Sequence, residues 1–135
     1  MAEDNGKVLD LEQAVINMGD RAMFVEMLAG FNQMSLEPNL HQLAEGMKTM
    51  DYPKIKMEAH TLKGTSSYLQ AMVFSNLCKD MQEAAIEENE QAILELYPKI
   101  ILQAIILKKT IAQQLAREKR NSFIFHSIIS FNFSK

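Results

Sequence analysis

The sequence predicts an all-α protein: an antiparallel up-and-down four-helix bundle with one short helix before it. Apolar residues recur at helical spacing through most of the chain, and no convincing strand alternation occurs before residue 122. Only 5 Gly and 3 Pro occur among 135 residues, which leaves few positions for turns. The connections between periodic segments are short, and short connections make successive helices antiparallel neighbours.

The chain is expected to open with a flexible lead, residues 1–7, followed by a short helix. The apolar residues of that helix follow the spacing i, i+3, i+4, i+7: Leu11, Ala14, Val15 and Met18. Gly19 suits its C-terminal end because glycine accepts the left-handed conformation. Asp20 can then cap the next helix through its side chain.

Three helices are expected between Asp20 and about residue 86. The first runs to about Met50, and Pro38 inside it predicts a kink or a brief break. Asp51 can cap the second, which extends to about Leu69. After a short turn near residues 70–72, the third carries an apolar stripe of Phe74, Leu77, Met81 and Ala84.

The final predicted helix is long, and the segment after it differs in composition. Apolar spacing continues to Leu115, with an early kink expected at Pro98. We therefore divide the chain into the lead, a bundle domain over residues 8–118, and a tail over residues 119–135. The tail begins with basic residues and then holds four of the seven Phe, at positions 123, 125, 131 and 133. A segment folded onto the bundle, a disordered end, a dimer contact and a weak membrane-surface anchor all fit this composition.

Composition excludes several classes of function. A net charge of -3 gives no general attraction to nucleic acid. The single cysteine, Cys78, excludes an internal disulfide and a cysteine-based zinc site. The chain opens without a signal-peptide pattern, and no apolar run approaches the ~20 residues that span a bilayer. A soluble, cytoplasmic protein is therefore expected, with nuclear shuttling allowed if the source is eukaryotic.

One histidine stands out because of its position on its predicted helix. At ~100° per residue, Ile55, Leu62 and Leu69 lie roughly 180–220° from His60. These three apolar residues are seven apart and form one buried stripe. His60 is therefore expected to face solvent, opposite the core.

The neighbours of His60 on its own face suit a phosphoryl group. Lys63 and Gly64 lie one turn after it, Lys56 lies one turn before it, and Ser67 continues the row. A phosphoryl group adds about two negative charges, which the lysines are placed to offset. Imidazole is a good nucleophile at neutral pH because much of it is uncharged. Glycine in a helix interior costs about 1 kcal/mol relative to alanine, and close approach of another molecule would justify that cost. An ordinary solvated face with an incidental histidine is equally compatible with these residues.

Three further residues complete the candidate site. If the following turn is centred near Ala71, Gln82 lies level with His60 and could hydrogen-bond the ring nitrogen that does not react. An ordinary surface glutamine fits that position as well. Met57 and Tyr68 flank the histidine and would contribute apolar docking area.

The string His60-Thr61-Leu62-Lys63-Gly64-Thr65-Ser66 closely resembles the signature of histidine-containing phosphotransfer (HPt) domains: His, two residues, Lys, Gly, then small residues. The resemblance extends over about residues 8–115. Residues 10–20 resemble the family's first helix and turn, and residues 24–38 resemble its second helix. Residues 51–52 resemble the usual start of the histidine helix, and residues 76–83 the helix that follows it.

The resemblance implies a phosphoryl carrier in a two-component phosphorelay, without catalytic turnover of its own. His60 would be phosphorylated on its outer ring nitrogen, Lys63 would support the phosphoryl group, and Gly64 would give a partner access. Gln82 falls where some members carry a glutamine that contacts the histidine. The partners would be a hybrid sensor histidine kinase and the receiver domains of response regulators, which supply the aspartate and Mg²⁺. No cofactor is expected on this chain, and a monomer is expected.

One position departs from the family pattern. Many members have Gly ten residues after the histidine, where this chain has Gln70, so the local turn is in doubt.

A metal-dependent helical enzyme is disfavoured because His41, His60 and His126 lie far apart and no HExxH motif is present. A bundle that serves only as an interaction scaffold is the alternative to a phosphoryl carrier.

Overall fold

The computed structural model describes the backbone of residues 7–133 and the side chains of residues 7–121, and this part is helical without strands. The elements in order are α1 (Leu11–Met18), α2 (Arg21–Phe31), the π-helical turn η1 (Asn32–Leu36), α3 (Glu37–Thr49), α4 (Tyr52–Tyr68), α5 (Met72–Ile86) and α6 (Glu90–Phe133). The predicted all-α class and the order of the helices are confirmed.

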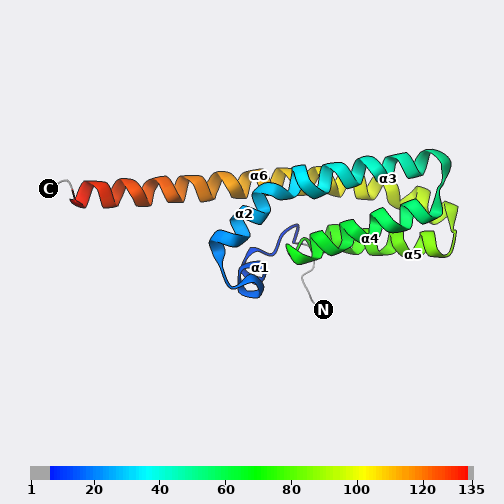
Figure 1. Cartoon of the computed structure of the whole chain (residues 1–135), viewed down its shortest axis with the longest axis horizontal. Coiled ribbons are helices and arrows are strands. Elements are labelled where there is room, and N and C mark those ends of the chain that lie inside the picture. Colours follow the sequence, from blue (N-terminus) through cyan, green and yellow to red (C-terminus); the bar gives the residue numbers. More distant parts are fainter. Residues whose placement is uncertain (1–6, 134–135) are drawn as a thin grey trace.

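Helices α3, α4, α5 and α6 run alongside one another as an elongated bundle, and α2 bends away from α3 toward α1 at one end (Figure 1). The core between them is apolar. Its largest fully buried side chains are Phe24, Leu28, Leu36, Leu43, Ile55, Leu62, Leu69, Phe74, Met81, Ile93, Ile100 and Leu107. Because these residues come from every long helix, one continuous core holds the bundle together.

The caps that begin and end the first helices follow the sequence expectation. Gly19 ends α1 with φ 78°, in the left-handed region. The Asp20 carboxylate accepts a hydrogen bond from the backbone N–H of Met23 at 3.3 Å and so caps α2. These caps fix the sharp turn between the first two helices.

The break expected at Pro38 is present and has a definite form. The helix widens into the π-helical turn η1 directly before α3, and Pro38 lies in the first turn of α3. Proline has no N–H to donate, and its ring crowds the carbonyl four residues earlier, so it disfavours a regular α-helix at this point. A π-helical turn accommodates the missing hydrogen bond. The helix α6, by contrast, continues through Pro98.

The turn between α4 and α5 forms without the expected glycine. Gln70 adopts the left-handed conformation itself, with φ 61°. Its carbonyl accepts a hydrogen bond from the backbone N–H of Asp10 at 3.0 Å, which ties the segment before α1 to this turn. The turn is centred on Gln70, one residue before the predicted centre at Ala71.

The tail does not fold back onto the bundle. Its backbone continues α6 to Phe133, and Figure 1 shows this part of the helix extending beyond the other elements. No Gly or Pro follows Pro98 in the sequence, so no residue ends the helix at the expected boundary near residue 119. The backbone of residues 119–133 is thus an extension of the last bundle helix; residues 134–135, like residues 1–6 of the lead, lie outside the described part.

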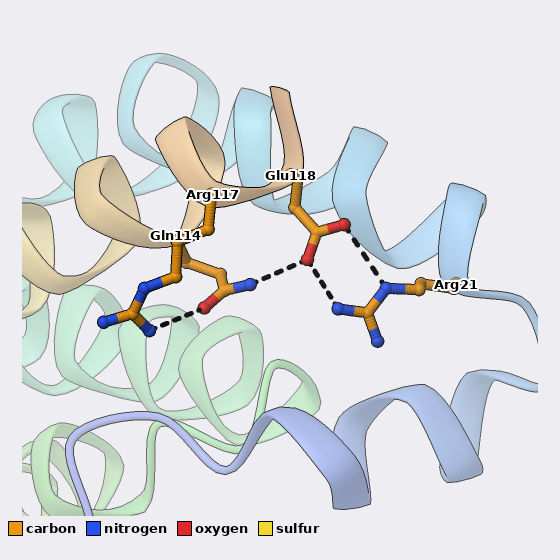
Figure 2. A network of polar contacts seen from close by, with 4 residues as sticks. All are labelled: Arg21, Gln114, Arg117 and Glu118. Carbon is orange, nitrogen blue, oxygen red and sulfur yellow. Dashed lines mark hydrogen bonds and ion pairs between the residues drawn. The ribbon is translucent and has the colours of Figure 1, made fainter. Parts of the chain in front are cut away.

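A polar network holds α2 against α6 at the point where α6 leaves the bundle (Figure 2). Arg21 donates two hydrogen bonds to the Glu118 carboxylate, at 2.6 and 3.3 Å, and Gln114 donates a third at 2.7 Å. These bonds lower the pKa of Glu118 below its ordinary value, the Arg21 hydrogen bond being the largest cause. Elsewhere, Lys108 pairs with Glu37 between α6 and α3.

No helix in the described part of the chain is both long and apolar enough to cross a membrane.

Candidate functional site

Helix α4 carries the candidate site and has well-defined ends. The Asp51 carboxylate accepts a hydrogen bond from the backbone N–H of Lys54 at 3.2 Å, and Pro53 occupies the first turn, where its missing N–H costs nothing. The helix ends at Tyr68, just before the left-handed Gln70. His60 therefore lies in the middle of a helix that is fixed at both ends.

His60 is exposed to solvent, as the sequence predicted. The opposite side of α4 is fully buried: Ile55 and Leu62 have no exposed surface, and Leu69 is 1% exposed. The helical spacing therefore directs the imidazole away from the core and toward an incoming partner.

One side of His60 is basic. Lys56 and Lys63 fall within ~60° of the histidine on the same side of α4, and Ser67 falls between them and the histidine. Lys56 is exposed and Lys63 half-buried, and neither ammonium group forms an ion pair within the described residues. The two positive charges beside the imidazole are therefore available to a phosphoryl group.

The other side of His60 is uncharged and largely apolar. Gly64, Met57 and Tyr68 lie ~40–80° from the histidine on this side. The side chains of Met57 and Tyr68 are 58% and 56% exposed. The site is thus asymmetric, with charge on one side of the imidazole and an apolar surface on the other.

Gly64 is not required by packing. A Cβ atom built at this position meets nothing within 4 Å, and its φ lies outside the left-handed region. Neither internal packing nor backbone strain therefore demands glycine here. Access from outside remains as the physical reason for it.

A hollow of about 260 Å³ lies beside Tyr68, between α4 and the arm formed by α2 and η1. It is lined by Glu26, Met27, Gly30, Phe31, Met34, Ser35, Thr65, Tyr68 and Leu69. Met34 at its edge is 83% exposed. The hollow lies between helices, so helical spacing does not predict it. That spacing places Met34 on the same apolar face as the buried Phe24, Leu28 and Phe31, and the exposure of Met34 is a correction to that prediction.

Gln82 lies on α5 and is half-buried. The hydrogen bond from Ser75 to the Lys63 carbonyl shows which positions of α5 and α4 lie side by side. Counting along the two antiparallel helices from this pair places Gln82 within about one helical turn of His60 along the bundle axis. No hydrogen bond joins Gln82 to His60 in the part of the chain that is described. Contact between these two side chains thus stays a prediction.

Other reactive chemistry is not assembled nearby. Burial raises the pKa of the Cys78 thiol to about 12, so the thiolate nucleophile is not populated at neutral pH. Within the described residues, no group of three or more His, Cys, Asp or Glu side chains could hold a metal ion.

Comparison with known proteins agrees with this geometry. The family model of the Hpt domain matches residues 21–117, which is most of the chain. The protein therefore belongs to the Hpt domain family, and its role is histidine phosphotransfer in a phosphorelay. Members of this family are phosphocarriers.

The crystal structure of histidine-containing phosphotransfer protein B (HptB) from Pseudomonas aeruginosa PAO1 has the same fold. It superposes with a TM-score of 0.75 at 22% sequence identity, over 84% of this chain and 98% of that one. The curated proteins contain no match to this chain.

Proposed function

We propose that this protein accepts a phosphoryl group on His60 from a receiver-domain aspartate, or from a hybrid sensor histidine kinase, and passes it to the receiver aspartate of a response regulator. One observation carries the proposal: an exposed imidazole in mid-helix has two lysines without ion pairs on one side and a bare glycine, Gly64, on the other. That arrangement offers nucleophile, charge compensation and access together.

On this chain the nucleophile of the transfer is the imidazole of His60. The lone pair of the outer ring nitrogen attacks the phosphorus of the receiver's aspartyl phosphate, and a nitrogen–phosphorus bond forms. The bond from phosphorus to the aspartate oxygen breaks, which returns the aspartate as a carboxylate. The onward step runs in reverse with a second receiver. Mg²⁺ would be held by the receiver, so we expect no cofactor on this chain.

The lysines and the glycine have separate roles in this proposal. Lys63 and Lys56 offset the negative charge that gathers on the phosphoryl oxygens in the transition state. Gly64 lets the receiver's aspartate reach the imidazole. Met57 and Tyr68, with the hollow beside Tyr68, would supply apolar docking area for the receiver. Ser67 and Gln82 would orient the phosphoryl group and the ring. All these residues belong to one chain, so a monomer suffices, and we place it in the cytoplasm with its partners.

The test is phosphotransfer from a labelled receiver domain to the purified protein. The wild-type chain should gain acid-labile phosphate, and His60→Gln should gain none while keeping its helical content and melting temperature. A scaffold would leave the wild-type chain unlabelled. Labelling of His60→Gln would place the acceptor elsewhere.

A second experiment separates charge compensation from docking. Lys63→Ala should slow transfer with little change in receiver affinity, because the cation acts mainly on the transition state. Replacing Met57 and Tyr68 together by Ala should weaken receiver binding instead. Lys99→Ala is the matched control, since Lys99 is exposed on α6 away from the site. Equal transfer by Lys63→Ala and Lys99→Ala would remove Lys63 from the site.

A further inference from the structure

The backbone carbonyl of Lys63 accepts hydrogen bonds from two serine hydroxyls, in addition to the backbone hydrogen bond of the helix. Ser75 of α5 donates to it across the helix pair at 3.0 Å, and the Ser66 hydroxyl of α4 forms the longer branch of a bifurcated bond to it, at 3.3 Å. Ser66 also donates to the Leu62 carbonyl at 2.6 Å. Both serines are buried, with exposed fractions of 2% for Ser75 and 0% for Ser66.

These two hydroxyls lie in an otherwise apolar contact between α4 and α5. The two helices that carry them bury apolar residues in the core, among them Leu62 of α4 and Phe74 and Cys78 of α5. A buried hydroxyl costs free energy unless it is hydrogen-bonded, and here the available acceptors are helix carbonyls. Ser75 forms its bond with a carbonyl of the neighbouring helix rather than of its own, so it fixes α5 to one peptide group of α4.

That peptide group joins Lys63 to Gly64, and the glycine weakens the helix there for two reasons. Glycine lowers helix stability by about 1 kcal/mol relative to alanine. Gly64 also has no side chain to pack, and no heavy atom lies within 4 Å of where its Cβ would be. A hydrogen bond to the carbonyl contributes stability of the same order as the glycine removes. The serine bonds are therefore of the size needed to offset the glycine.

We infer that Ser75 is a positioning residue for phosphotransfer: with Ser66 it holds the Lys63–Gly64 peptide in helical geometry, so that the glycine gives access without loosening the helix under His60 and Lys63. The inference rests on the proposed role of His60 for its effect on transfer. Its structural part, the restraint of one peptide group, does not depend on that role.

The test is a double-mutant cycle between Ser75 and Gly64, read by amide hydrogen exchange. In an α-helix the N–H of Ser67 donates to the Lys63 carbonyl, so its exchange reports on this peptide. Ser75→Ala should speed exchange at Ser67 by roughly fivefold, the equivalent of one such hydrogen bond. In a Gly64→Ala background, Ser75→Ala should speed exchange at Ser67 by less than half as much, because alanine has a higher helix propensity than glycine. Thr110→Ala, which removes a hydroxyl bonded within α6, should leave Ser67 unaffected.

The transfer rate supplies the second readout. Ser75→Ala should slow transfer a few-fold at unchanged receiver affinity, and Ser75→Thr, which keeps the hydroxyl, should restore it. Equal acceleration of exchange in the wild-type and Gly64→Ala backgrounds would overturn the inference, since the serine would then support packing in general. Unchanged exchange at Ser67 would overturn it as well.

The exchange readout also separates this inference from the proposed function. If His60→Gln still became labelled while Ser75→Ala loosened Ser67, the proposed acceptor would be wrong and the restraint on the peptide would stand. If Ser75→Ala does not fold, Ser66→Ala carries the same cycle, because it removes the other hydroxyl that lies within bonding distance of the Lys63 carbonyl.

Discussion

Two glycines lie near the C-terminal ends of neighbouring helices, Gly46 in α3 and Gly64 in α4, and face opposite environments. Gly46 of α3 is buried, and a Cβ added there would meet Ile55 Cγ1 at 3.2 Å and Lys54 Cγ at 3.4 Å. Gly64 of α4 is exposed, and a Cβ there would meet nothing within 4 Å. The same residue type thus permits close packing of α3 on α4 in one place and leaves an open surface beside His60 in the other.

The surroundings of each glycine indicate its role in the protein. A glycine at a helix contact shortens the distance between two backbones, and its replacement strains the core. A glycine on an open face has no such internal reason, so its cost in helix propensity points outward, to a binding partner. The same substitution at the two positions should therefore affect different properties of the protein.

The largest expected effect is that of Gly64→Gln on phosphotransfer. The new side chain would stand one turn from His60 on the face that the receiver must approach, so we expect transfer to slow roughly 100-fold, as small misplacements of reacting groups do. Receiver affinity should fall too. Thermal unfolding should be unchanged or slightly raised, by roughly 0.5 kcal/mol from helix propensity. Stopped-flow or labelled-transfer kinetics measure the first effect, and wild-type kinetics would refute the access argument.

The next effect is that of Gly46→Gln on stability. Ile55 beside it is fully buried and cannot move aside easily. We expect a loss of about 2 kcal/mol or more from overpacking, seen as a lower midpoint of urea unfolding. Transfer per folded molecule should stay at the wild-type rate, since the side chain lies away from His60. A Gly46→Gln protein as stable as wild type would show that the α3–α4 contact is looser than the 3.2 Å distance indicates.

A smaller gain in stability is expected from a substitution at Gln70, whose backbone is in the left-handed conformation that glycine adopts most readily. Gln70 has φ 61°, which costs a residue with a side chain about 1–2 kcal/mol. Gln70→Gly removes that cost but adds backbone entropy to the unfolded chain, so the net gain should be roughly 0.5–1 kcal/mol. Calorimetry should show a melting temperature higher by about 2–4 °C. A lower value would mean that the Gln70 side chain, 3.5 Å from the Ser67 carbonyl, contributes more than its backbone costs.

The smallest expected effect concerns the Arg21–Glu118 pair, far from both glycines. Arg21 is 54% exposed, so Glu118→Gln should cost less than about 1 kcal/mol at neutral pH. The pair lowers the pKa of Glu118 in the folded state. Its contribution is therefore present above the unfolded-state pKa and is lost as the pH falls through the lower folded-state pKa. Melting temperatures of wild type and Glu118→Gln should differ at neutral pH and converge in acid, below the folded-state pKa; a constant difference would argue against the ion pair.

Much of the fold and the position of the candidate site were predictable because helical periodicity is a local property. The spacing of Leu62 and Leu69 identified the buried side of α4, and that alone placed His60 outward. Local capping chemistry likewise identified Asp20 and Asp51 as helix starts. The residues around His60 on its own helix were predictable for the same reason.

Contacts between helices could not be predicted in this way, because they depend on which segments distant in sequence meet. The tertiary structure decided that Gly46 packs and Gly64 does not, and that Ser75 reaches the Lys63 carbonyl. It also gave Gln70 a backbone conformation that its residue type disfavours, because the turn and its bond to Asp10 require it. The sequence by itself determined which side of each helix is apolar and where His60 points; only the packing of the helices decided which of those sides meet and what remains open beside the histidine.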